Sequence, residues 1–168
     1  KDAPAHITVI HVRNTLQAYW DFCTYYRNLF EIPVVAITGT CGKTTTKEML
    51  KHILSKDMLV QTSISSINEP RQSLGYLLGI EDETKAAVFE LGLGNSGNIS
   101  HQCRVYQPTI GVITNIGVHH LDGCKDLNGY IQAKGEILAG IRAGGTLILN
   151  ADDEHTKKLP IATYKNKV

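Results

Sequence analysis

The sequence predicts an α/β fold, organised as a doubly wound and mostly parallel sheet. Short apolar runs rich in β-branched residues recur along the chain, stretches with helical spacing separate them, and most of the runs lack polar alternation. Strands that are buried on both faces of a parallel sheet have this continuous apolar character. Strands that alternate with helices are typical of βαβ units. In such sheets ligands bind beyond the carboxyl ends of the strands, so the loops there are the candidate site.

Six apolar runs are the predicted strands, and four amphipathic stretches are the predicted helices. The predicted strands are Ile7–Val12, Val34–Thr38, Leu59–Gln61, Ala86–Leu91, Thr109–Thr114 and Thr146–Leu149. The predicted helices are Asn14–Leu29, Lys43–Leu54, Pro70–Leu78 and Asp126–Ile141, the first with Asn14 as its N-cap.

The composition excludes several classes of protein. The 168 residues are enough for one compact domain, and 42% of them are hydrophobic. Lys and Arg number 17 against 16 for Asp and Glu, and this balance gives no indication of a nucleic-acid partner. No apolar run approaches the roughly 20 residues that span a bilayer. The four cysteines are far apart in the sequence and form no C-x-x-C pair. This spacing is typical of the reduced thiols of a cytosolic protein. We therefore expect a cytoplasmic protein with no nucleic-acid partner and no membrane span.

A glycine-rich segment, Thr38–Thr46, lies between a predicted strand and a predicted helix and reads T-G-T-C-G-K-T-T-T. Glycines let successive N–H groups turn toward an anion, and the helix N-terminus and Lys43 add positive charge. A hydroxyl of Thr44 or Thr45 can bind Mg²⁺. The spacing is G-x-x-G-K-T, shorter than the usual phosphate loop (P-loop). The alternative is a glycine turn before a helix that begins with Lys. We predict nucleotide binding by Gly39, Thr40, Cys41, Gly42, Lys43, Thr44 and Thr45.

Glu90 stands at the end of the predicted strand Ala86–Leu91. If that strand neighbours the one before the phosphate loop, the carboxylate lies where a metal-bound nucleotide needs an oxygen ligand. The alternative is a strand-end Glu that faces solvent. We predict a metal ligand.

The loop after the next strand, Thr114–Asp122, carries Asn115 and the pair His119-His120. Imidazole is a metal ligand when neutral and a phosphate partner when protonated. A zinc site would need further ligands at suitable spacing, and the sequence has none there. A structural histidine is the other alternative. We predict that one histidine of the pair is functional.

Lys134 occupies the centre of an apolar helix stripe. The stripe consists of Leu127, Ile131, Leu138 and Ile141, and Lys134 fills the missing position. A buried lysine costs free energy unless it has a partner, and burial lowers its pKa so that a neutral, reactive amine remains. The alternative is a lysine that extends past a short core to solvent. The spacing supports both equally.

Together these residues resemble the central, ATP-binding domain of the Mur ligase family. Its members use ATP to activate a carboxylate as an acyl phosphate, which an amine then attacks to form an amide. The family motif T-G-T-x-G-K-T-T-T matches Thr38–Thr46, and its metal-binding Glu matches Glu90. T-N-[IV]-x-x-x-H-L-[DE] matches Thr114–Asp122, A-K-x-E-I matches Ala133–Ile137, and N-x-D-D matches Asn150–Asp153.

The resemblance implies ATP and Mg²⁺ as cofactors, with two metal sites. Its implied catalytic residues are Lys43, His120 and Lys134. Its implied metal ligands are Thr44, Thr45, Glu90, His120 and Lys134, the last as a carbamylated lysine. Asn115 and Asn150 join the phosphate loop as implied ATP contacts.

The resemblance also implies partners beyond ATP and a division into domains. The carboxylate-bearing precursor and an amino-acid or dipeptide acceptor would be held by domains outside this chain. Residues 1–30 would be an incoming segment and helix from the end of a preceding domain. Residues 31–168 would be the ATP-binding central domain, truncated at its C-terminal end, so we expect the isolated chain to be inactive or nearly so.

Within the family, Val12–Leu16, Lys47-Glu48 and Asn68-Glu69 echo the branch that adds a dipeptide to a peptidoglycan precursor in cell-wall synthesis. Four departures from that branch fit a paralogue of cyanophycin or polyglutamate type, with another acceptor. They are Asn14, Cys41, Pro70-Arg71 and Asn98. A nucleotide-binding module that forms no bond is a further alternative. A GTPase is a weaker one, because it would need a guanine-reading N-K-x-D, and Asn166-Lys167-Val168 stops before the acid.

Overall fold

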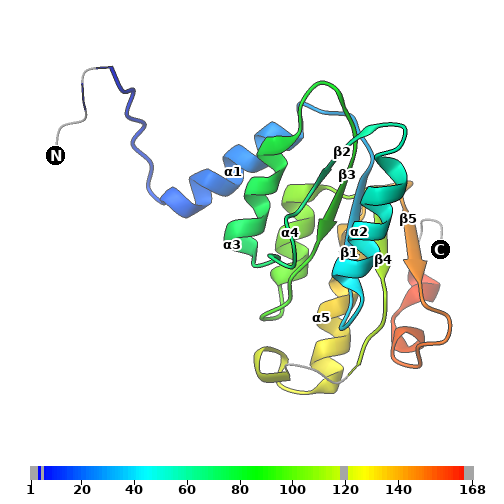
Figure 1. Cartoon of the computed structure of the whole chain (residues 1–168). Helices are drawn as coiled ribbons and strands as arrows, with labels where there is room; N and C mark the ends of the chain where they lie inside the picture. Colours follow the sequence, from blue (N-terminus) through cyan, green and yellow to red (C-terminus); the bar gives the residue numbers. More distant parts are fainter. Residues whose placement is uncertain (1–3, 5, 118–120, 165–168) are drawn as a thin grey trace.

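The computed structural model describes residue 4 and residues 6–117 and 121–164, and within them it forms a single five-stranded sheet. The strands are β1 (Val34–Thr38), β2 (Leu59–Thr62), β3 (Thr84–Glu90), β4 (Ile110–Ile113) and β5 (Thr146–Leu149). Their order is β2-β3-β1-β4-β5, and every neighbouring pair is parallel (Figure 1). The predicted α/β class with a parallel sheet is confirmed.

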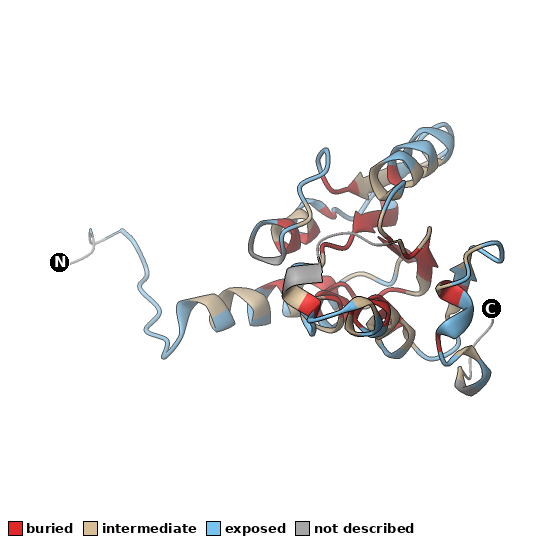
Figure 2. Cartoon of the chain, turned by 90° about the horizontal axis from the view of Figure 1, so that it is seen from below, coloured by how far each residue is buried: buried red, intermediate tan, exposed pale blue. Residues whose placement is uncertain are grey.

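Helices cover both faces of this sheet. They are α1 (Thr15–Arg27), α2 (Lys43–Leu54), α3 (Pro70–Ser73), α4 (Asn98–Tyr106) and α5 (Leu127–Gly140). The described part of the chain also contains the 3-10 helices η1 (Leu74–Gly79), η2 (Leu121–Cys124), η3 (Thr156–Lys158) and η4 (Ile161–Thr163). Helix α2 lies on one face, whereas α1, α4 and α5 lie on the other, as the two views show (Figures 1 and 2). The sheet is therefore doubly wound, as predicted.

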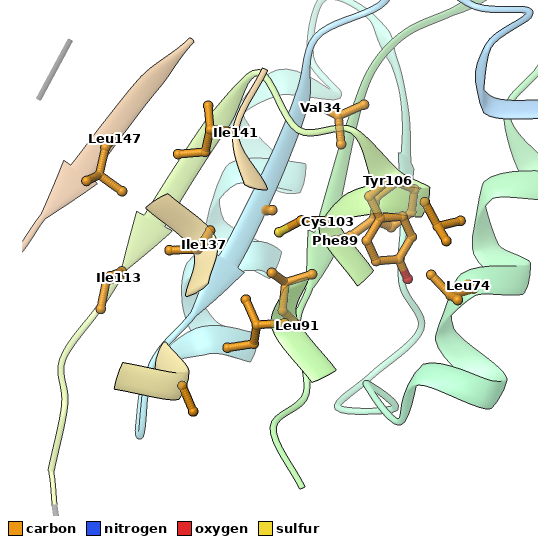
Figure 3. Packing of buried hydrophobic residues seen from close by; sticks show 14 of the residues in the cluster. Val34, Leu74, Phe89, Leu91, Cys103, Tyr106, Ile113, Ile137, Ile141 and Leu147 are labelled. Atoms are coloured by element: carbon orange, nitrogen blue, oxygen red, sulfur yellow. The ribbon is translucent and has the colours of Figure 1, made fainter. Parts of the chain in front are cut away.

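The two faces carry unequal cores. The larger core packs β-strand side chains against α1, α4, α5 and η1, and Figure 3 shows Phe89 of β3 beside Tyr106 of α4. These two rings stack with centroids 4.5 Å apart. The smaller core consists of Val35, Ile37, Val88 and Val112 under α2. The all-buried pattern of β1 explains why its sequence lacks polar alternation.

The register of the central strands brings three loops to one edge of the sheet. Ile37 of β1 is opposite Glu90 of β3, and Thr38 is opposite Ile113 of β4. The glycine-rich segment, Glu90 and the loop that begins at Thr114 thus all leave the sheet at its carboxyl edge. This is the arrangement that places ligands in doubly wound folds.

The predicted strand Ile7–Val12 is wrong. Residues 8–12 have no regular structure, and the side chain of Ile10 is 80% exposed. A strand is stable only when it pairs, and within the described residues no strand lies beside this run. Conversely, helix α4 was not predicted, although Ile99, Cys103 and Tyr106 have helical spacing and are buried.

Helix α1 is fixed to the rest of the domain by its last turns. Asn14 caps it as predicted, since its side chain accepts a hydrogen bond from Gln17 N–H. The buried Arg27 donates to the carbonyl of Tyr106, and Tyr26 Oη donates to the carbonyl of Ile80. The assignment of residues 1–30 to a preceding domain stays a prediction. Among the described helices, none has the length and apolar character needed to cross a bilayer.

Candidate nucleotide and metal site

The segment Thr38–Thr46 forms a tight loop between β1 and α2. Gly39 has φ +145° and Gly42 has φ +81°, conformations that side-chain-bearing residues rarely adopt. Gly42 is the N-cap of α2 and makes no side-chain hydrogen bond there, so the first N–H groups of the helix remain available. The loop therefore presents main-chain donors and a helix N-terminus at the carboxyl edge of the sheet.

Residues after β4 brace this loop. The amide side chain of Asn115 accepts from Cys41 N–H (3.0 Å) and donates to Cys41 C=O (3.3 Å). Thr114 Oγ1 also donates to that carbonyl (2.6 Å), and Asn150 Nδ2 donates to the carbonyl of Thr114 (3.1 Å). Asn115 and Asn150 thus hold the loop and its support in place, and their direct contact with ATP stays a prediction.

Glu90 points into the structure. Its side chain is 2% exposed, so the solvent-facing alternative is wrong. Its carboxylate accepts from Thr44 Oγ1 (2.7 Å) and from Asn68 Nδ2 (2.6 Å). Lys43 Nζ lies 3.7 Å from Oε1 and supplies the opposite charge. A carboxylate and a hydroxyl that touch one another are oxygen donors of the kind Mg²⁺ prefers.

Lys43 keeps most of its hydrogen-bonding capacity. Its Nζ is 3.4 Å from the carbonyl of Thr40 and 3.7 Å from Glu90, and both separations are long for hydrogen bonds. The side chain is 18% exposed. An ammonium has three N–H donors, so Lys43 can bind an anion that enters the loop.

Lys134 lies beneath the same loop. It is 2% exposed, and its Nζ donates to the carbonyl of Gly39 (2.9 Å) and to Thr38 Oγ1 (3.2 Å). The alternative in which it extends to solvent is therefore wrong. Burial, and then the positive charge of Lys43, lower the pKa of Lys134 to about 7, with partial opposition from Cys124 and Glu90. Near neutral pH a large fraction of this amine is unprotonated.

These groups share one cavity of about 640 Å³. It is lined by Gly39, Thr40, Gly42, Lys43, Thr44, Thr45, Ser66, Asn68, Glu90, Gly92, Leu93, Tyr130 and Lys134. The predicted residues of the phosphate loop, the metal-ligand candidate and the unusual lysine therefore meet in space. Of the predicted cofactor contacts, Cys41, Asn115 and Asn150 lie outside the lining of this cavity, and Asn115 and Asn150 brace the loop to which Cys41 belongs.

The predicted metal ligands stay a prediction. Among them, no three His, Cys, Asp or Glu side chains gather as a metal site. Glu90 and the Thr44 hydroxyl are the oxygen donors present, and they suit one Mg²⁺. His119 and His120 lie outside the described residues.

Five residues of the cavity lining had no predicted role, and two of them, Asn68 and Tyr130, contact predicted site residues. Asn68 donates to Glu90, and Tyr130 Oη lies 3.2 Å from Thr40 Oγ1. Tyr130 precedes Lys134 by four residues, so helical spacing alone places both on one face of α5. No local pattern could have indicated Asn68, because its approach to Glu90 depends on how the segment between β2 and α3 folds.

A parallel, doubly wound sheet with a glycine-rich loop after its central strand, a lysine, a hydroxyl and a carboxylate defines an α/β domain of the nucleotide-binding P-loop class. The family model described as the Mur ligase middle domain matches residues 37–168. The chain belongs to this family.

Proteins similar to this chain point in the same direction. A UDP-N-acetylmuramoyl-tripeptide--D-alanyl-D-alanine ligase from Buchnera aphidicola is 37% identical over 158 residues, which cover 92% of this chain and 34% of that protein. The crystal structure of MurF from Acinetobacter baumannii has a TM-score of 0.91 and 32% identity, and the match covers 99% of this chain and 37% of that one. A pseudomurein peptide ligase type C from Methanothermus fervidus has a TM-score of 0.66 and 36% identity, covering 82% and 27% of the two chains. The chain spans about a third of the length of the curated relatives it matches.

Proposed function

We propose that this chain is the ATP-binding part of an ATP-dependent carboxylate–amine ligase that forms an amide through an acyl phosphate. The observation that carries the proposal is the single cavity lined by the phosphate loop, Glu90 and Lys134. The similarity to D-alanyl-D-alanine ligases supports a role in the synthesis of peptidoglycan precursors. The precursor and the acceptor would be held by parts of the protein outside this chain.

The phosphates of ATP would bind to Lys43 and to main-chain N–H groups of the loop Gly39–Thr44 other than those of Thr40 and Cys41, which already donate to Asn115. Lys43 has free donors and faces Glu90 across the cavity. As the γ-phosphoryl group moves to a carboxylate, negative charge spreads over its oxygens, and the N–H groups and Lys43 stabilise that charge. Catalysis of this kind depends mostly on positioning.

Mg²⁺ would be held by Thr44 or Thr45 together with Glu90. It would neutralise the phosphate charge during transfer. His120 and a carbamylated Lys134 would hold a second ion. The neutral amine of Lys134 can attack CO₂, forming an N–C bond and releasing one proton from nitrogen, which leaves a carboxylate on the side chain. The pKa of about 7 and the position beneath Gly39 support this role.

Carbamylation can be tested by nuclear magnetic resonance with isotope-labelled bicarbonate. We expect a carbamate signal that is lost in Lys134→Gln and kept in Lys51→Gln, a change at an exposed lysine of α2. An unmodified Lys134 amine, with bicarbonate and Mg·ATP both present, would overturn this part of the proposal.

Calorimetry tests the phosphate-loop assignment. Lys43→Ala should abolish measurable ATP binding. Lys43 belongs to the loop, lines the cavity and keeps free N–H donors, so the change removes a positive charge that would bind the phosphates. Lys51→Ala should bind ATP as the wild type does. Unchanged affinity in Lys43→Ala would contradict the assignment.

Ligase activity is tested on the complete protein. With ATP, a UDP-linked muramoyl tripeptide and D-alanyl-D-alanine, we expect ADP release that depends on the dipeptide. ATP binding without acceptor-dependent ADP release would favour a nucleotide-binding module.

A peptide ligase with another acceptor is the second candidate. The similarity to the pseudomurein peptide ligase and the departures at Cys41 and Asn98 favour it. ADP release with other amino acids or peptides, but not with D-alanyl-D-alanine, would identify this case.

A further inference from the structure

A second lysine on α2 has a role that nucleotide binding does not explain. Lys47 follows Lys43 by four residues, one helical turn, and its side chain is wholly buried. Its Nζ donates to the carbonyls of Ser63 (2.8 Å) and Ser65 and pairs with Glu48 Oε1 (3.0 Å). An ammonium has three N–H donors, so these three partners occupy all of them.

This saturation separates Lys47 from Lys43. Lys43 lines the cavity and keeps free donors, whereas the described residues that line the cavity do not include Lys47. A lysine with no free donor and no access to the cavity has no means of binding a phosphate. Burying a charged side chain also costs free energy, which an aliphatic residue at this position would avoid. The role of Lys47 therefore lies in its contacts with other residues of the protein.

The two carbonyls belong to the segment of residues 63–69, which connects β2 to α3. Within it, Ser65 has φ +49°, an unusual conformation for a residue with a side chain. Lys47 binds the carbonyls on both sides of Ile64, one of them that of Ser65 itself. The hydrogen bond from Lys47 to the Ser65 carbonyl therefore lies at the residue of this segment whose conformation most needs support.

The same segment forms one side of the site. Ser66 and Asn68 line the cavity. Asn68 Nδ2 donates to Glu90 Oε1 (2.6 Å), and Ser63 Oγ accepts from the main-chain N–H of Glu90 (3.3 Å). The 63–69 segment therefore contacts both the side chain and the main chain of the candidate metal ligand.

We propose that Lys47 is a positioning residue that fixes the 63–69 segment, so that Asn68 orients the carboxylate of Glu90 toward the phosphate loop. Helix α2 then sets both sides of the site at once, through Lys43 and Thr44 at its start and through Lys47 one turn later. The functional half of this inference rests on the proposed roles of Lys43 and Glu90. The structural half, the ordering of the segment by Lys47, does not.

The test compares three variants of the complete protein. Lys47→Met keeps an unbranched side chain one atom shorter but leaves two carbonyls without their donor. Lys51→Met is the control on the same helix, because Lys51 is exposed. Asn68→Ala removes the contact with Glu90 and leaves Lys47 intact.

Amide hydrogen exchange without nucleotide reports on the segment. In Lys47→Met we expect exchange of residues 63–69 to rise by about tenfold or more, with β1 and α5 unchanged. Lys51→Met should match the wild type. A segment as protected as in the wild type, or a rise spread evenly over the whole chain, would overturn the inference.

The Mg²⁺ concentration needed for half-maximal ATP binding reports on Glu90. We expect it to rise by about tenfold in Lys47→Met and in Asn68→Ala, and no further in the double variant, because both act through one contact. ATP binding without Mg²⁺ should stay within about twofold of the wild type. If Lys47→Met does not fold, Asn68→Ala still decides, since an unchanged Mg²⁺ requirement there would overturn the link to Glu90. A wild-type protein that binds no ATP would refute the proposed function but leave the exchange result standing.

Discussion

Lys43 Nζ lies 3.7 Å from Glu90 Oε1, although the two residues belong to different elements and meet only because β1 and β3 are neighbours in parallel register. Glu90 is almost wholly buried, and its charge is compensated by Lys43 and by hydrogen bonds from Thr44 and Asn68. A buried carboxylate is tolerated only with such partners. Lys43 and Glu90 therefore balance each other's charge, and replacing either one changes the net charge of the cavity and its affinity for charged ligands.

Glu90→Gln should affect free ATP and Mg·ATP in opposite directions. Without Mg²⁺ the carboxylate repels the phosphates, so its removal should leave the affinity unchanged or raise it. With Mg²⁺ an oxygen ligand is lost, and we expect affinity to fall by about tenfold. Calorimetric titration with and without Mg²⁺ measures both. The control is Glu83→Gln, at an exposed position. Equal enhancement of binding by Mg²⁺ in Glu90→Gln and in the wild type would contradict the metal role.

Cys41 should be the cysteine that reacts with a thiol-alkylating reagent in the native chain. It is exposed within the phosphate loop, whereas Cys23, Cys103 and Cys124 are buried. We expect N-ethylmaleimide to modify one site, and an adduct there to obstruct the entry of phosphates. Mass spectrometry of peptides identifies the site, and nucleotide binding is measured before and after.

ATP should protect Cys41 from the reagent, and Cys41→Ser should bind ATP yet resist alkylation. Two results would count against this assignment: modification at the same rate with saturating ATP, or an alkylated chain that binds ATP as well as the untreated one.

The site was predictable from sequence where local pattern and strand topology suffice. The glycines of Thr38–Thr46 indicate a phosphate-binding loop from the sequence alone. Glu90 lies beside this loop because the carboxyl ends of parallel strands share one edge of the sheet. Lys134 was recognisable as a lysine on an apolar helix stripe, but its burial and its partners were not predictable, because spacing alone does not decide between a core contact and a side chain extended to solvent.

What escaped prediction depends on contacts between residues distant in the chain. The path of the 63–69 segment is set by Lys47, which belongs to helix α2 and not to the segment. No sequence pattern within the segment indicates this path. The run Ile7–Val12 has strand-like composition but no partner strand among the described residues. Composition reports what a segment favours, whereas pairing and packing decide what it forms.

The buried amine of Lys134 should make stability depend on pH. Its pKa is about 7 in the folded chain, against about 10.4 for an ordinary lysine, so between these values the unfolded chain binds more protons. The free energy of unfolding should therefore rise with pH in this window, and the gain is lost as pH falls toward 7. From pH 7 to pH 9 the rise is about 2 kcal/mol.

Urea unfolding at the two pH values, in buffers purged of CO₂ to exclude carbamate, measures this rise. Lys134→Met should lack it, whereas Lys51→Met, changed at an exposed lysine, should retain it. If Lys134→Met kept the full pH dependence of the wild type, the buried amine would not be its source.

Gly39→Ala should damage the loop far more than Gly42→Ala. Both glycines have positive φ, so each alanine strains the backbone, by about 1–2 kcal/mol at Gly42 (φ +81°) and by more at Gly39, whose φ of +145° lies outside the left-handed helical region. At Gly42 the added methyl group meets nothing closer than 3.9 Å, whereas at Gly39 it would overlap Thr114 Oγ1, which braces the loop through the carbonyl of Cys41. We expect Gly39→Ala to lose measurable ATP binding and Gly42→Ala to keep a weakened form of it. Calorimetry measures the ATP affinity of both variants, with circular dichroism to confirm folding, and equal losses of affinity would contradict the greater demand for glycine at position 39.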